Sequence, residues 1–153
     1  MAIAFIGLGS NLGDRENNLN QAVQALATLP QTRVMQVSKW QETEPIGGPP
    51  QGKYLNGVVQ LETLQNALTL LYDLQDIEHT LGRPKEHAHW GPRIIDLDLL
   101  SYDELILQTP ALTVPHPRIQ ERRFVLASLA EIAPNWRHTT LGKTASQLLT
   151  EVP

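Results

Sequence analysis

The chain has 153 residues, a formal net charge of −4 and no cysteine. Its length predicts one domain, and a content of 41% hydrophobic and 18% charged residues excludes collagen-like, coiled-coil and disordered chains. The absence of cysteine excludes disulfide scaffolds, cysteine-bound zinc, iron–sulfur clusters and thiol nucleophiles. The acidic balance argues against a protein that coats nucleic acid through general positive charge.

The N-terminal segment has the pattern of a buried strand. Residues 1–6 are mostly apolar, no basic residue precedes them, and a glycine-rich turn follows, so we expect no secretory signal. No stretch approaches the roughly 18 apolar residues that a membrane span needs. We therefore expect a cytoplasmic protein that works without a membrane.

The remaining elements alternate in a recognisable order. The apolar periodicity predicts a strand at 3–8, a helix from Asp14 to Pro30, strands at 33–43 and 54–63, a helix at 64–81 that Gly82 ends, a strand at 94–102, and C-terminal helices at 123–133 and 144–149. A loop rich in proline and glycine, 44–52, joins the second and third strands. This order predicts a ferredoxin-like βαββαβ fold, an antiparallel sheet with helices on one face and C-terminal helical additions, as a single domain over 1–153.

Two glycine-containing segments come close to nucleotide-binding motifs without matching them. Residues 7–13 depart from G-x-G-x-x-G because Leu12 stands where the third glycine is required. Residues 142–144 read like the end of a P-loop, but Arg137 stands where its first glycine should be, and no strand precedes it. We interpret both segments as ordinary turns.

Asp96 and Asp98 alternate with Leu97 and Leu99 in a predicted strand, so both carboxylates project from one face, about 6.6 Å apart along the chain. Aspartate is depleted in strands, so two on one face need a reason. Hard oxygen ligands at this spacing suit Mg²⁺ held against substrate phosphates. The alternative is an exposed sheet face with paired charges.

Positive charge gathers in two segments, 83–93 and 116–123, which also contain His87, His89 and His116. Six of the 12 basic residues lie there: Arg83, Lys85, Arg93, Arg118, Arg122 and Arg123. Guanidinium groups bind phosphate oxygens in a bidentate manner. Either segment alone could be a solvated basic loop, but both segments together with the aspartate pair favour a polyphosphate site.

Gln75 and Glu78 fall within the apolar stripe of the helix predicted at 64–81, so we expect both to point inward. A buried carboxylate needs a partner. The residues alone favour a structural ion pair with an arginine over a direct ligand role for Glu78. The five histidines show no paired spacing typical of a zinc site, and no serine, histidine and aspartate arrangement stands out.

Residues 90–100, from Trp90 to Leu100, closely resemble the signature of the hydroxymethyl-dihydropterin pyrophosphokinase family. Further similarity runs in order through 9–13, 43–45, 54–56 and 112–117, and then through Arg122 and Phe124. The resemblance therefore covers nearly the whole chain. It implies transfer of pyrophosphate from ATP to the hydroxymethyl group of 6-hydroxymethyl-7,8-dihydropterin, which gives AMP and a pterin diphosphate for tetrahydrofolate biosynthesis.

The resemblance also implies roles for particular residues. It makes Asp96 and Asp98 the ligands of two Mg²⁺ ions, and it adds Arg83 and Arg93 to these two as catalytic residues. The residues expected to bind ATP are Gln75, Glu78, Arg83, Lys85, Trp90, Arg93, Leu99, Thr113, His116 and Arg122. Those expected to bind the pterin are Thr43, Pro45, Ile46, Tyr54, Asn56, Asp96 and Phe124, of which Tyr54 and Phe124 would stack on the two faces of the ring.

The sequence departs from the family pattern at three positions. Lys85 and His89 stand where many relatives carry arginine, and Ala111 stands where some carry a cation, which weakens bidentate contact with phosphate. Three other functions stay open: a Mg²⁺-dependent hydrolase of nucleotides or diphosphates, an RNA-binding module, and a relative that binds both ligands without catalysis. We expect a monomer whose partners are the two small-molecule substrates.

Overall fold

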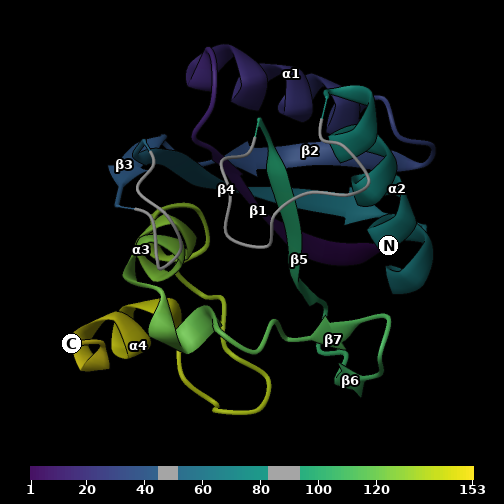
Figure 1. The fold of residues 1–153 in the computed structure, drawn as a ribbon. Helices are drawn as coiled ribbons and strands as arrows, with labels where there is room; N and C mark the ends of the chain where they lie inside the picture. The colour runs from purple at the N-terminus through teal and green to yellow at the C-terminus, as the bar shows by residue number, and fades with distance from the viewer. Residues whose placement is uncertain (45–51, 83–93) are drawn as a thin grey trace.

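The computed structural model describes residues 1–44, 52–82 and 94–153, and Figure 1 shows their arrangement. Five strands form the main sheet, and two more form a small ribbon. The strands are β1 (Ala2–Ser10), β2 (Thr32–Val37), β3 (Gln41–Thr43), β4 (Tyr54–Thr63), β5 (Asp96–Tyr102), β6 (Leu107–Gln108) and β7 (Thr113–Val114). The helices are α1 (Arg15–Ala27), α2 (Ala67–Thr80), α3 (Arg123–Ile132), α4 (Ala145–Glu151) and the short 3₁₀ helix η1 (Ile119–Glu121).

The main sheet has the order β2-β4-β1-β5, with β3 paired to β4, and each of these pairs is antiparallel. The ferredoxin-like prediction is therefore confirmed. Within it, α1 and α2 each connect strands that are not neighbours, as a split βαβ arrangement requires.

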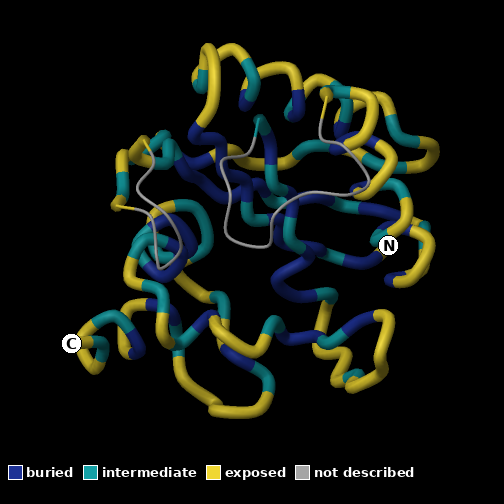
Figure 2. The backbone as a smooth tube through the Cα atoms, viewed as in Figure 1, coloured by how far each residue is buried: buried dark blue, intermediate teal, exposed yellow. Residues whose placement is uncertain are grey.

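Helices cover both faces of this sheet (Figure 1). One core lies under α1 and α2 and includes Ile6, Leu26 and Leu74. The other lies under α3 and α4 and includes Phe5 and Leu126. Alternate residues of β1 thus enter opposite cores, and the strands in the middle of the molecule are buried (Figure 2). The expected C-terminal additions form a second layer.

The strand predicted at 33–43 is two strands, because a buried hydroxyl interrupts the ladder. Ser38 accepts the backbone N–H of Val58 with its Oγ at 2.9 Å, and its own N–H donates to the Val58 carbonyl at 2.9 Å. Trp40 then lies against Gly57, where a Cβ would come within 2.4 Å of the indole ring. A side chain at position 57 would displace this ring.

The helix predicted at 64–81 begins three residues later. The Asn66 side chain accepts the N–H of Thr69 at 2.8 Å and caps the first turn, which leaves Leu64 outside the helix and 58% exposed. At the other end Gly82 has φ +111°, which confirms it as the predicted stop. The ribbon β6–β7 and the helix η1 had no counterpart among the predicted elements.

A β-bulge changes the face of β5. Phe5 pairs with Ser101 and Ile6 with Leu99, so Leu100 is an extra residue in the ladder. Leu100 lies in the core beneath α3, as its alternation with Asp98 predicts, whereas Tyr102 packs against the core beneath α1 and α2. Uninterrupted alternation along the strand predicts that Tyr102 shares the face of the two aspartates, and because of the bulge this prediction is wrong.

Candidate active site

The register of three strands brings the predicted pterin and metal residues onto one part of the sheet. Gly9 of β1 pairs with Asn56 of β4 on one side and with Asp96 of β5 on the other. Two strand spacings separate Asn56 from Asp96, roughly 10 Å. The residue between them has no side chain, which leaves room on the sheet surface for the side chains of neighbouring residues.

Glycine at position 9 is required by the side chains beside it. A Cβ there would lie 2.7 Å from Asn56 Oδ1 and 3.3 Å from Tyr54 Cδ1. Both side chains therefore lean over Gly9, on the sheet face that α3 covers. A flat ring placed on this surface would contact the Tyr54 ring and the Asn56 amide together.

Asn56 is only 8% exposed, and its Nδ2 donates a short hydrogen bond to Thr43 Oγ1. Thr43 pairs with Tyr54 at the end of β3. Asn56 and Thr43, both predicted to bind the pterin, are thus hydrogen-bonded to each other, and Tyr54 is paired with Thr43. This bond fixes the direction of the Asn56 amide, which is the group that would recognise the edge of the ring.

Phe124 lies in the first turn of α3, on the helical side of the same surface. It is half-buried and packs against the core formed with Val125 and Leu126. Gln41 Nε2 donates to the Phe124 carbonyl oxygen at 3.2 Å and to Ser128 Oγ at 3.0 Å. Sequence reasoning missed Gln41, because its pairing with Asn56 is visible only once β3 is registered on β4.

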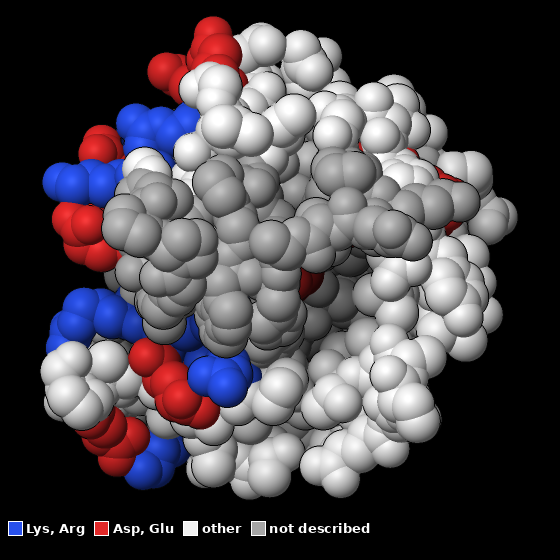
Figure 3. Space-filling view, in the orientation of Figure 1, with Lys and Arg blue, Asp and Glu red and all other residues white. Residues whose placement is uncertain are grey.

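The two aspartates begin β5, and both side chains are partly exposed. Arg122 Nη1 lies 3.9 Å from Asp98 Oδ2, with 27% of the arginine side chain and 47% of the aspartate side chain exposed. Arg122, which is predicted to bind phosphate, therefore lies beside Asp98, which is predicted to bind the metal. In Figure 3 a small patch of acidic atoms is visible at the edge of the hollow near the middle of the molecule, and the visible Lys and Arg side chains gather on the side of β3, α3 and α4.

The pair Asp96 and Asp98 fits Mg²⁺ by its chemistry. In the described residues, no group of three or more histidine and carboxylate side chains is arranged to hold a metal. Mg²⁺ is commonly held by one or two carboxylates and completes its shell with water and substrate phosphates, so two carboxylates on one strand face suffice.

Glu78 is 9% exposed, and its Oε2 accepts the backbone N–H of Leu97 at 2.7 Å. Leu97 lies between the two aspartates in β5, which is an edge strand. The inward position expected for Glu78 is thus confirmed, and the carboxylate satisfies a backbone donor of the strand that carries both aspartates.

Gln75 does not point inward as expected. The buried positions of α2 are 67, 70, 74, 77 and 78, and Gln75 follows Leu74 on the exposed side of that stripe. Its predicted role in ATP binding requires contact from this outer surface of α2.

His116 approaches the same region from the loop after β7. The backbone N–H of His116 donates to the Leu100 carbonyl at 2.8 Å, and its ring Nδ1 accepts the backbone N–H of Arg118 at 3.1 Å. Burial lowers the pKa of His116 to about 4, and the nearby Arg122 and Arg118 add to the effect. The imidazole is therefore neutral at pH 7, and because Nδ1 accepts, its proton lies on Nε2.

Leu99 and Thr113 complete the predicted ATP set in the described chain. The Leu99 side chain is 3% exposed and belongs to the core under α1 and α2, so only its backbone can meet a ligand. Thr113 is half-buried at the start of β7. The other predicted site residues lie outside the described residues: Pro45, Ile46, Arg83, Lys85, Trp90 and Arg93.

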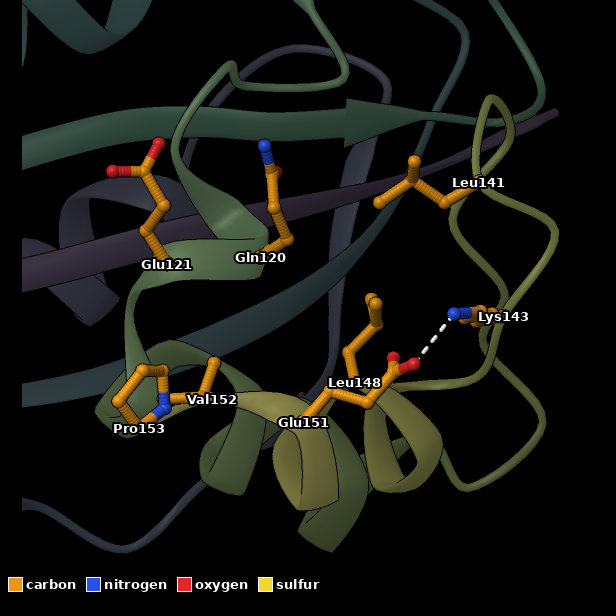
Figure 4. Close-up of a pocket in the computed structure, with 8 residues that line it drawn as sticks. All are labelled: Gln120, Glu121, Leu141, Lys143, Leu148, Glu151, Val152 and Pro153. Carbon is orange, nitrogen blue, oxygen red and sulfur yellow. Dashed lines mark hydrogen bonds and ion pairs between the residues drawn. The ribbon is translucent and has the colours of Figure 1, made fainter.

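A separate pocket lies between η1 and α4 (Figure 4). Lys143 and Glu151 form an ion pair of 2.6 Å at its rim. The pocket is lined by Gln120, Glu121, Leu141, Lys143, Leu148, Glu151, Val152 and Pro153. None of these is a predicted site residue. We do not assign the activity to this pocket.

Residues 5–134 match the family model described as 7,8-dihydro-6-hydroxymethylpterin-pyrophosphokinase, HPPK. The chain belongs to this family. It is therefore an enzyme, a pyrophosphokinase.

Curated relatives agree with this membership, and all three of the following carry the name 2-amino-4-hydroxy-6-hydroxymethyldihydropteridine pyrophosphokinase. The Bacillus subtilis protein is 48% identical over 130 residues, which cover 85% of this chain and 77% of that protein. The Synechocystis protein is 42% identical over 97% of this chain and 75% of its own length. The Pseudomonas aeruginosa protein is 40% identical over 97% of this chain and 91% of its own length.

Solved structures show the same fold. Plasmodium falciparum HPPK-DHPS with pteroate matches with a TM-score of 0.75 at 14% identity, over 98% of this chain. This chain spans 42% of the length of that protein. No helix of the described ranges 1–44, 52–82 and 94–153 has the length and apolar character needed to cross a membrane.

Proposed function

We propose that this pyrophosphokinase transfers the diphosphoryl group of ATP to the hydroxymethyl group of 6-hydroxymethyl-7,8-dihydropterin on the sheet surface around Gly9. The observation that carries this location is the register of Gly9 with both Asn56 and Asp96. The pterin ring lies on the Asn56 side, between Tyr54 and Phe124, and the phosphates lie toward β5. The ring and the reacting phosphate then share one open surface.

In this arrangement the residues of the pterin half bind and orient the acceptor. The Asn56 amide, fixed by Thr43, hydrogen-bonds the polar edge of the ring, and the two aromatic side chains stack on its faces. Holding the ring fixes the direction of its hydroxymethyl group, which converts the reaction into a positioned intramolecular event.

The residues of the phosphate half bind and neutralise the donor. The hydroxyl oxygen of the pterin forms a bond to the β-phosphorus and releases its proton to water, the bond from that phosphorus to the oxygen of the α-phosphate breaks, and AMP leaves. The Arg122 guanidinium and the Nε2–H of neutral His116 donate to phosphate oxygens on which negative charge is concentrated. Asp96 and Asp98 would hold Mg²⁺, which when bound supplies charge neutralisation at the phosphates.

Several finer parts of the function are also proposals. They are two Mg²⁺ ions, the tasks of Arg83, Lys85, Trp90 and Arg93 at the phosphates, a monomeric state and a cytoplasmic location. The single domain over 1–153 is supported by the one sheet that both cores share.

The activity is tested by the release of AMP from ATP and Mg²⁺, with and without the dihydropterin, together with the mass of the pterin product. We expect AMP only when pterin is present, and a product heavier by one diphosphoryl group. Release of phosphate or diphosphate without pterin would identify a hydrolase instead. Binding of both ligands without AMP would leave only a binding protein.

A further inference from the structure

Gln41 connects the sheet to α3 beside the proposed pterin slot. One wall of this slot is formed by Tyr54 and Asn56, and the other by Phe124. It is the first residue of β3 and pairs with Asn56 of β4. Its side chain crosses to α3, where Nε2 donates to the Phe124 carbonyl at 3.2 Å and to Ser128 Oγ at 3.0 Å. One amide nitrogen therefore ties the strand that pairs with Asn56 to the helix that carries Phe124.

The first turn of α3 has no side-chain cap of its own. Arg122 stands at the N-cap position and makes no capping hydrogen bond. Lys39, two residues before β3, contacts the C-terminal end of α3, because its backbone N–H donates to Glu131 Oε2 at 3.0 Å. The segment 39–41 thus contacts α3 near its beginning and near its end, and only the Gln41 contact reaches the turn that contains Phe124.

We propose that Gln41 is a positioning residue, which sets the distance between the Phe124 ring and the Tyr54–Asn56 wall and thereby the affinity for the pterin. The inference rests on the proposed function. An aromatic slot accepts a flat ring only at van der Waals separation, and a gap of roughly 0.5–1 Å already loses a quarter to a half of the attraction of each atom pair. A small outward movement of the first turn of α3 would therefore weaken stacking.

The fold itself does not depend on this contact. The rest of α3 is anchored by Val125, Leu126 and Leu129, which are 4% exposed or less in the core beneath it. Loss of the two hydrogen bonds, one to the first turn of α3 and one to Ser128 in its middle, should therefore shift the slot and leave the sheet intact. A pterin-specific defect distinguishes this role from a general loss of structure.

The test uses Gln41→Glu, which has nearly the same shape but presents a carboxylate to the Phe124 carbonyl and removes both N–H donors. Gln36→Glu makes the same change at an exposed position of β2 and serves as the matched control. The full chain is titrated with 6-hydroxymethyl-7,8-dihydropterin, followed by pterin fluorescence, and the KM for each substrate is measured. Melting temperatures of all variants are compared.

We expect Gln41→Glu to weaken pterin binding and raise the pterin KM by about 10-fold, while the KM for ATP changes less than about 2-fold. Ser128→Ala, which removes one of the two acceptors, should act in the same direction by a smaller factor. This second variant decides the question if Gln41→Glu does not fold. Gln36→Glu should behave as the unmodified chain does.

Pterin binding by Gln41→Glu equal to that of the unmodified chain would overturn the inference and leave the proposed function standing. An equal rise in both KM values with a lowered melting temperature would also overturn it, because that is the signature of a structural role. Absence of pterin binding in the unmodified chain would overturn the proposed function itself.

Discussion

At the scale of single residues, the proposed site depends on Gly9, which has no side chain. Gly9 leaves room for the Asn56 amide and the Tyr54 ring, which both lie where its Cβ would be. The sequence predicted a turn after residue 8, whereas the structure places Gly9 inside β1, where a glycine often marks a close approach of other groups. Its two pairing partners explain why the approach occurs here.

Gly9→Ala should therefore reduce pterin affinity by about 10-fold or more, since overpacking of this kind costs roughly 1–3 kcal/mol. Gly7→Ala is the matched control on the same strand, because the atoms nearest to its Cβ would belong to the flexible Leu100 side chain, at 3.4 Å and beyond. Pterin titration of both variants measures the difference. Equal affinities in the two variants would show that the surface above Gly9 is not the pterin site.

Acid should destabilise the protein through His116. Its pKa is about 4 in the folded chain and 6.5 in the reference state, so the unfolded chain takes up a proton at higher pH than the folded chain. The contribution of His116 to the free energy of unfolding is fully present above pH 6.5 and decreases toward pH 4, by up to about 1.4 kcal/mol per pH unit. Burial also lowers the pKa of His138, which adds in the same direction.

Urea unfolding at several pH values between 7.5 and 4.5 measures this slope. His116→Gln should reduce it, because glutamine does not titrate. An unchanged slope in this variant would assign the acid sensitivity to other groups.

At the scale of elements, α4 can be weakened apart from the site. Thr144 and Gln147 form a complete capping box, with hydrogen bonds of 3.2 Å and 2.8 Å between side chain and backbone in the two directions. Thr144→Ala should lower the free energy of unfolding by roughly 1 kcal/mol, with little change in the pterin KM. Ser146→Ala, at an exposed position of the same helix, is the control. Chemical denaturation of the two variants compares the effects, and equal stabilities would contradict the capping role.

Element types and order were predictable because the apolar periodicity is strong in β1, α1, β4, α2 and β5. The interruption of the second strand was not, because it depends on the Ser38 hydroxyl meeting the backbone of Val58, a partner 20 residues away. The bulge at Leu100 depends in the same way on its pairing with β1. Long-range backbone contacts of this kind leave little local signal.

The candidate site divides in the same manner. Strand alternation identified Asp96 and Asp98, and the family motifs supplied Asn56, Tyr54 and Phe124. The inward position of Gln75 was wrong, since it is one residue away from the buried stripe of α2. The contacts of Gln41 and Gly9 with the other site residues emerged only from the register of β3, β4, β1 and β5.

At the scale of the whole molecule, one sheet separates two cores and also carries both halves of the proposed site. In the proposed site the acceptor half lies over β3, β4 and the start of α3, and the donor half lies over β5 and the loop that contains His116. Figure 1 shows where these elements lie. Although the chain has a net charge of −4, Arg122 lies 3.9 Å from one of the two aspartates. In the proposed site Arg122 would face the phosphates despite the acidic balance of the chain.

This division is the central claim, and a pterin titration of AMP release by two variants tests it. Asn56→Ala should raise the pterin KM by about 10-fold or more with a smaller change in kcat, because it removes ring recognition. Asp98→Asn should lower kcat by roughly 100-fold with little change in pterin affinity, because it removes charge from the phosphate half. Near-normal turnover by Asp98→Asn, or the same kinetic defect in both variants, would contradict the account.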